Sequence, residues 1–312
     1  MILTLIVVAG AGVLGLAGPG ARLGQRLHPA HGARLILGAL IVGVSLVEAG
    51  LVLWSTPVLL DVAGLVDLAA VCRRILGGPP PGGTPGGLAA GMGAVWLASS
   101  VVRGGWRVYS TQRGLRIDPA ITPTDRREDF DLYVAASPRR MAYTVGGRRP
   151  QVIVTSAVAD QLPTSLFEVI MAHEAVHARN RHHRFLALVA GVEAAFGWIH
   201  PVARAAESVR LSLERWADED ASLDAARGRS DVRRALLSAC LTEATGAPGF
   251  GDPDMVLARI SGLDGPAPSR ASMWTTVAFT SFGCLSITAL VIVTWATRMS
   301  ILTLVHTGQC LV

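Results

Sequence analysis

The sequence predicts a mainly α-helical integral membrane protein, with four transmembrane helices and a cytoplasmic α+β domain between the third and the fourth. Hydrophobic residues make up 51% of the 312 residues and charged residues 16%, against roughly 25% charged in an average soluble domain. Four apolar runs approach or exceed the length of a membrane span. The polar stretch before the last run holds short β-like segments and then helical patterns. This composition excludes a disordered chain and a small disulfide-bonded domain.

The four apolar runs are residues 1–18, 35–60, 88–102 and 271–297. The first lacks a basic leader and a small-residue cleavage site, so we expect a retained helix rather than a signal peptide. The second contains a single charged residue, Glu48. An acidic residue within a span is a functional candidate, and the alternative is a carboxylate that only joins neighbouring helices.

The distribution of arginine orients these spans, because short loops rich in Arg stay on the cytoplasmic side. Such arginines follow the first and the third span: Arg22, Arg26, Arg34, Arg103, Arg107, Arg113 and Arg116. We therefore expect a plasma-membrane protein with both termini outside. The Gly- and Pro-rich stretch Gly77–Gly87 is predicted to be an external linker that holds no helix. The chain divides into three expected parts, residues 1–103, 104–270 and 271–312.

The expected cytoplasmic domain begins with β-like segments. Asp131–Ala136, Ala142–Val145 and Gln151–Thr155 are short runs with strand character, and together they predict a small antiparallel sheet or hairpin. A helix is then expected to begin near Ser165, because Ser165 and Glu168 have the spacing of a capping box.

This helix carries the sequence His173-Glu174-Ala175-Val176-His177. Two histidines four residues apart project from one face of a helix, and two imidazoles so placed can bind one Zn²⁺. Glu174 lies between them, where it can act as general base toward a water molecule. The motif therefore predicts a zinc peptidase site with one Zn²⁺ per chain.

Glu214 is the candidate for the third zinc ligand. Glu214 and Asp218 are four residues apart on one predicted helix, so Asp218 is placed to orient a ligating histidine through its free ring N–H. The alternative is a solvated, ion-paired helix face, since this stretch is dense in charge. Three other residues compete for the role of third ligand: Glu207, Glu219 and His200.

Further polar residues follow the motif. Arg179, His182 and His183 are candidates for contacts with the substrate or the transition state, and the alternative for the two histidines is a surface position or a supporting role behind the ligands. Residues 185–199 are apolar but short for a span. One crossing there would also separate His173 and His177 from Glu214, so we expect a core, interfacial or re-entrant helix.

Taken together, these residues resemble the BlaR/MecR-type antirepressor membrane metallopeptidases of the gluzincin class. The resemblance covers the helix order and most of the chain. Its motifs are residues 150–156 (PQVIVTS), 172–177 (AHEAVH), 181–183 (RHH) and 200–202 (HPV), with the pair Glu214 and Asp218. It implies that His173, His177 and Glu214 bind zinc, that Glu174 is the catalytic base, and that Asp218 is the accompanying acidic residue.

The resemblance also implies a substrate, a cytoplasmic winged-helix repressor of the BlaI/MecI type, with possible self-cleavage of the peptidase. Family members with an external penicillin-binding sensor domain carry it after the fourth helix. Here residues 299–312 follow that helix, and the sequence contains no Lys for a Ser-x-x-Lys motif. Direct sensing of β-lactams by these residues is therefore not expected.

Two other functions compete with this one. An HtpX-like quality-control protease shares the His-Glu-x-x-His motif and the Glu-x-x-x-Asp helix, and a non-catalytic signalling protein would keep zinc only for stability. Direct binding of nucleic acid is not expected, because no recognition motif is present. The predicted topology places Cys72 and Cys310 outside, where they could form a disulfide.

Overall fold

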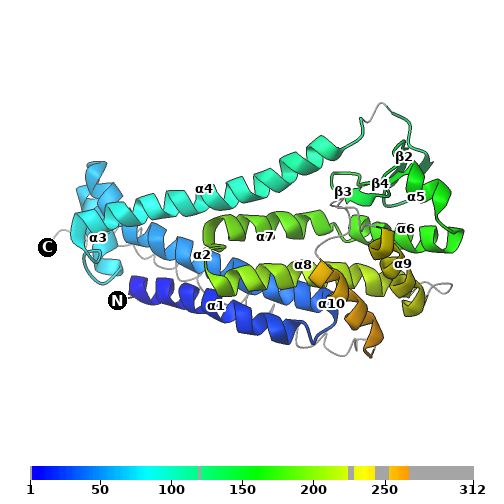
Figure 1. The fold of residues 1–312 in the computed structure, drawn as a ribbon. Coiled ribbons are helices and arrows are strands. Elements are labelled where there is room, and N and C mark those ends of the chain that lie inside the picture. Colours follow the sequence, from blue (N-terminus) through cyan, green and yellow to red (C-terminus); the bar gives the residue numbers. More distant parts are fainter. Residues whose placement is uncertain (1, 119–120, 224–227, 243–252, 267–312) are drawn as a thin grey trace.

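The structure is a computed structural model that describes residues 2–118, 121–223, 228–242 and 253–266. It is mainly helical, with one small sheet. Figure 1 shows long helices running side by side, with the sheet at one end of the bundle and a short helix, α3, at the other. The chain therefore has a rod-like helical body with a mixed α and β head.

Three helices in the described residues are long and apolar enough to cross a membrane: α1 (Ile2–Gly24), α2 (Pro29–Val62) and α4 (Gly83–Leu115). They contain the first three apolar runs of the sequence. Helix α3 (Val66–Ile75) connects α2 to α4. The expected fourth span, residues 271–297, lies outside the described residues, as do Cys284 and Cys310. Cys72 is free, and its pairing with Cys310 stays a prediction.

Glycines let α1 and α2 approach closely. A Cβ atom at Gly10 would lie 2.9 Å from the carbonyl oxygen of Gly43, and one at Gly50 would lie 2.4 Å from Val7 Cγ2. Small residues at the contact bring two backbones together, which is how helices associate in lipid.

The prediction that Gly77–Gly87 holds no helix is wrong in its second half, since α4 begins at Gly83. Pro85 lies in the first turn, where its missing N–H has no helical partner to lose. Gly86 and Gly87 are close-contact positions, because Cβ atoms there would lie 2.1 Å from Pro81 O and 2.3 Å from Val58 Cγ2. Glycine is needed at these two positions because a side chain would clash with the neighbouring segment.

The sheet has four strands, β1 (Asp125–Arg126), β2 (Asp131–Ala135), β3 (Ala142–Val145) and β4 (Gln151–Thr155), in the order β1-β2-β4-β3. The expected hairpin is confirmed in β3 and β4, but β2 and β4 are parallel, so the sheet is mixed. All five residues of β4 are buried, and a strand covered on both faces takes a central position. Strand β3 is consequently an edge.

Six helices follow the sheet in the described residues. They are α5 (Ser156–Gln161), α6 (Thr164–Arg179), α7 (His182–Phe196), α8 (His200–Ser222), α9 (Arg229–Thr242) and α10 (Pro253–Asp264). Helices α7 and α8 pack along α1, α2 and α4. One core joins Leu14, Ile36 and Leu40 of the apolar helices to Val209 and Leu213 of α8. This core extends across the expected boundary at residue 103, and α4 itself crosses it.

Candidate active site

Helix α6 presents the central motif. It begins after Pro163, and no side chain caps its first turn, so the predicted capping box of Ser165 and Glu168 is wrong. Proline with its fixed φ ends the preceding extended segment and starts the helix one residue earlier. The helix ends at Asn180, whose backbone N–H donates to the carbonyl of Val176.

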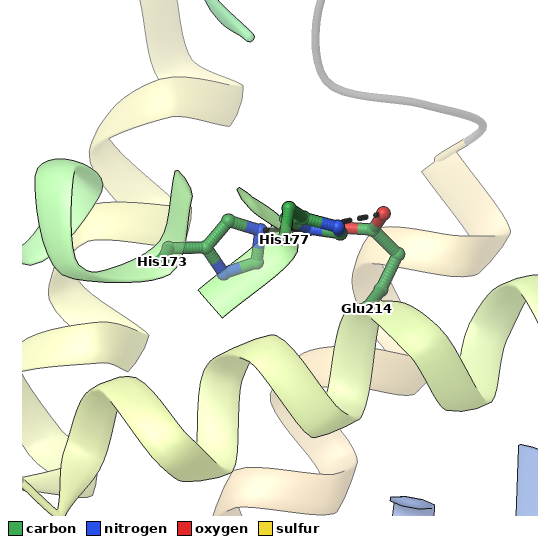
Figure 2. A group of neighbouring side chains, drawn as sticks. All are labelled: His173, His177 and Glu214. Atoms are coloured by element: carbon green, nitrogen blue, oxygen red, sulfur yellow. Dashed lines mark hydrogen bonds and ion pairs between the residues drawn. The ribbon is translucent and has the colours of Figure 1, made fainter. Parts of the chain in front are cut away.

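His173 and His177 of α6 meet Glu214 of α8 (Figure 2). The two Nε2 atoms lie 3.0 Å apart, and Glu214 oxygens lie 3.5 Å from His173 Nε2 and 3.6 Å from His177 Nε2. Ligands about 2.0 Å from a tetrahedral zinc ion are separated by roughly 3.3 Å. The three donors thus have the chemistry and the spacing of a zinc site, and all three residues line the pocket described below.

Asp218 lies behind His173. Its Oδ1 is 3.0 Å from His173 Nδ1, and its side chain is 1% exposed. A carboxylate in this place fixes the ring so that Nε2 points to the metal, and it makes the imidazole a stronger ligand.

His182 lies behind His177 in the same way. The two Nδ1 atoms are 2.8 Å apart, and the buried His182 Nε2 has no partner in the described residues. Burial, followed by the proximity of His177, lowers the pKa of His182 to about 3, so its ring is neutral and Nδ1 can accept a hydrogen bond from the Nδ1–H of His177. His182 thus contacts a candidate ligand through Nδ1, and it also lines the pocket described below.

A strained turn brings His182 back to His177. Only Asn180 and Arg181 separate α6 from α7, and Arg181 has a φ of 53°, in the left-handed region. This conformation costs a non-glycine residue about 1–2 kcal/mol. Such strain is typical of positions where the surrounding fold requires one geometry.

Glu174 is buried and faces the sheet side of the pocket. The hydroxyl of Thr144, on β3, lies 2.7 Å from Glu174 Oε2 and 2.9 Å from the Glu174 carbonyl oxygen. A hydroxyl that donates to one carboxylate oxygen leaves the other free to accept a proton from water. Thr144 therefore holds the candidate base in a single orientation.

Arg259 of α10 is 5% exposed and closes the acidic side of the site. Its Nε and Nη2 donate to both oxygens of Asp218 at 2.8 and 2.7 Å, and Nη1 lies 3.1 Å from Glu214 Oε2. Burial alone would raise the pKa of Asp218, but hydrogen bonds and the charge of Arg259 outweigh burial and lower it. The pKa of Glu214 is lowered by nearby His177 and His173 and by Arg259, against burial.

The two histidines of the motif differ in charge before a metal binds. Burial acts to lower the pKa of His173, but hydrogen bonds to Asp218 and Glu214 outweigh it and raise the pKa to about 9. For His177, burial is the largest effect and the pKa is lowered. A metal must therefore displace a proton from His173, because only neutral imidazole binds zinc.

The site opens into a pocket of about 270 Å³. Thr144 and Tyr143 of β3 line one side, and Met255 and Arg259 of α10 line another. Gln112, near the end of α4, also reaches the pocket, and its Oε1 accepts a hydrogen bond from the Gly146 N–H at 2.8 Å. The apolar helix α4 thus ends at the site.

The remaining candidates lie in different places. His183 lines the pocket and packs against Gly146. Arg179 forms an exposed ion pair with Asp129 at 3.2 Å and does not line the pocket, because it lies two residues from His177 and projects from another face of α6. Of the competing third ligands, Glu219 pairs with Arg229 at 2.6 Å, and Glu207 lines a different hollow. His200 begins α8, at the opposite end from Glu214.

Sequence reasoning missed Thr144, Gln112 and Arg259. An arginine within the apolar pattern of residues 255–263 was the available signal for Arg259. Thr144 and Gln112 carry no signal of their own, because a threonine in a short strand and a glutamine near a helix end are common.

Comparison with protein families agrees with this site. Residues 116–217, a third of the chain, match peptidase family M48, and this segment contains His173, Glu174, His177 and Glu214. The match supports the M48 metallopeptidase family and indicates a protease, and M48 peptidases are typically zinc-dependent. Comparisons with curated proteins and with solved structures gave no match. Together with three apolar helices, the match indicates a membrane-associated metallopeptidase.

Proposed function

We propose that this chain is a membrane-embedded zinc metalloendopeptidase that cleaves a cytoplasmic protein in signal-regulated proteolysis. The convergence of His173, His177 and Glu214 beside a buried, oriented Glu174 carries this proposal. A non-catalytic zinc protein needs the three ligands but has no use for a general base held by Thr144.

The residues of the site divide the chemistry among them. Zinc, when bound by His173, His177 and Glu214, polarises the scissile carbonyl and a water molecule. Glu174 accepts the proton of the attacking water and delivers it to the leaving amine. Asp218 and His182 keep the two rings in the ligating orientation.

The position of β3 at the edge of the sheet is evidence for a polypeptide substrate. It pairs with β4 on one side, and Ala142, Tyr143 and Thr144 line the pocket. An extended peptide can add to an exposed strand edge through main-chain hydrogen bonds. Such binding would place a peptide bond near Glu174 with little dependence on side-chain identity.

For the substrate we propose a winged-helix repressor of the BlaI/MecI type, which the resemblance to BlaR/MecR-type antirepressors supports. The helix order and the β segments ahead of the motif carry that resemblance. The proposed location is the plasma membrane, with both termini outside and the site in the cytoplasm, as the arginine distribution predicts. Self-cleavage belongs to the same proposal.

The second candidate is an HtpX-like quality-control protease for membrane proteins. The packing of α7 and α8 against the apolar helices favours it, because this packing holds the site close to the membrane. Membrane proteins would then be the natural substrates.

Quantitative proteomics of cells that carry wild type or Glu174→Gln at equal expression distinguishes these functions. We expect one DNA-binding repressor to accumulate in the variant, with its regulated genes switched off. Accumulation of many membrane proteins instead would identify the quality-control protease. A proteome unchanged under every stress tested would contradict proteolysis and favour the non-catalytic protein.

A further inference from the structure

The hairpin formed by α7 and α8 lies against apolar helices that cross the membrane. A Cβ atom at Gly104 of α4 would lie 2.2 Å from Ala190 O of α7, and one at Gly18 of α1 would lie 3.0 Å from Pro201 Cα of α8. Gly18 and Gly104 both belong to helices with the length and composition of a span. The turn of the hairpin, residues 197–199, therefore reaches the level of the spanning segments.

The outer surface of this hairpin is apolar near the turn on the α7 side, whereas α8 exposes His200, Arg204 and Glu207. Trp198, in the turn, is 78% exposed, and Leu188 of α7 is 48% exposed. Trp is enriched where membranes meet water, because its indole combines a large apolar body with one polar group. An exposed Trp beside spanning helices has the bilayer as its natural environment.

The backbone of the turn needs little water. Val202 and Ala203 donate their N–H groups to Ile199 O at 2.9 and 3.1 Å, and Gly197 N–H donates to Glu193 O at 2.8 Å. Pro201 has no N–H, and Trp198 Nε1 donates to the carbonyl of Ala195 at 3.1 Å. Internal pairing of this kind is what a non-helical segment requires at membrane depth.

Charges near the turn lie in one ion pair and in one hollow that holds both signs of charge. Glu193 forms an ion pair with Arg210 of α8, with Nη1 and Oε1 2.9 Å apart, so α7 carries no unpaired charge toward the turn. Arg22 of α1 and Arg204 of α8 line one hollow together with the carboxylates of Glu207 and Asp254. Arginines at this level suit lipid phosphates.

We propose that the turn of the α7–α8 hairpin inserts into the headgroup–acyl boundary of the bilayer, with Trp198 as its anchor. The insertion is on the side of the membrane that holds the metal site. Helix α7 has 15 residues, so at 1.5 Å per residue it holds His182 about 20 Å from the turn. The site then stays at a fixed height above the membrane.

Depth measurement on the full chain tests this insertion without using peptidase activity. In a background with the four native cysteines replaced by alanine, Trp198→Cys, Val95→Cys and Leu223→Cys each receive a nitroxide spin label. The three positions are exposed in the structure: Val95 lies on the spanning helix α4, and Leu223 follows α8 at the metal-site end. The proteins are placed in phosphatidylcholine–phosphatidylglycerol vesicles, and collisions with lipid-soluble oxygen and a water-soluble nickel chelate are compared.

We expect the label at 198 to favour oxygen, as the label at 95 does, while the label at 223 favours the nickel chelate. A label at 198 that behaves like the one at 223 would overturn the proposal. A label at 198 shielded from both reagents would also overturn it, because another protein segment, such as residues 271–297, would then cover the turn. The result holds whether or not the chain is a peptidase.

Discussion

His173 and His177 lie one turn apart on α6, yet their surroundings differ in charge. Behind His173 stands the ionised Asp218, itself fixed by Arg259, whereas behind His177 stands the neutral His182. The first histidine is held protonated before metal binds, and the second is held neutral. Two candidate ligands of the same type in one motif thus have different surroundings, and only the first has a supporting residue, Asp218, that is paired with α10.

This asymmetry makes α10 part of the site. Residues 253–264 follow Asp218 by more than thirty positions, yet Arg259 contacts both Glu214 and Asp218. Movement of α10 would change the charge around His173 through Asp218, and it would act on His177 less directly, through Glu214.

Arg259→Ala should have the largest effect on stability. It leaves Asp218 and Glu214 without a buried cation, and breaking a buried pair costs about 3–5 kcal/mol. Thermal unfolding in detergent, followed by circular dichroism, measures the loss. The matched control is Arg234→Ala, which breaks an exposed pair with Asp231 and should cost far less stability, because solvent screens an exposed pair. Equal losses in the two variants would mean that Arg259 does not support the site.

Asp218→Asn should weaken zinc binding more than His182→Ala does. Outer partners of ligating histidines contribute roughly 10–100-fold to metal affinity, and a charged acceptor forms about twice as strong a hydrogen bond as a neutral one. Competition with a zinc-binding dye measures both affinities. A loss of zinc affinity in His182→Ala that equals or exceeds the loss in Asp218→Asn would contradict the stronger role of Asp218.

Zinc affinity should increase with pH up to about pH 9. Below its pKa of about 9, His173 carries a proton that zinc must displace. Each unit of increase in pH lowers the free energy needed to remove this proton. His177 adds no such cost, because its pKa is lowered. Titration calorimetry at pH 7 in buffers of different ionisation enthalpy counts the released protons. Asp218→Asn should release fewer protons than wild type, and an unchanged number would refute the role of Asp218.

Thr144→Val should have the smallest effect, and it should be confined to turnover. The variant keeps the shape of the side chain but removes the hydroxyl that contacts Glu174, so we expect roughly a tenfold lower kcat with zinc content unchanged. Active-site titration and metal analysis separate the two readouts. Loss of zinc in this variant would indicate that Thr144 supports the ligands instead.

The sequence indicated the ligand set more readily than the fold around it. His173, Glu174 and His177 lie within five residues, and Glu214 and Asp218 have helical spacing, so local periodicity places each group on a face. Their meeting depends on α6 and α8 crossing, which no local pattern specifies. Arg259 could not be assigned because its partners are reached only when α10 folds back onto α8.

In the helical body, too, local sequence patterns did not specify how the elements contact one another. Apolar composition predicted the regions of α1, α2 and α4, but α4 extends to Leu115 because α7 packs along its polar half. The parallel pairing of β2 with β4 likewise depends on which strand occupies the centre. Local residues specify an element, whereas its neighbours determine its length and pairing.

Metal content and cleavage, measured together, test whether the chain is a zinc peptidase; wild type and Glu174→Gln are each purified as the full chain in lipid nanodiscs. We expect one zinc per chain in both proteins. Wild type should cleave an unfolded substrate such as casein, with activity removed by a chelator and restored by zinc, while the variant should be inactive. Cleavage by Glu174→Gln at the wild-type rate would contradict the role of Glu174 as the base. A wild-type protein that binds no zinc would contradict a zinc peptidase.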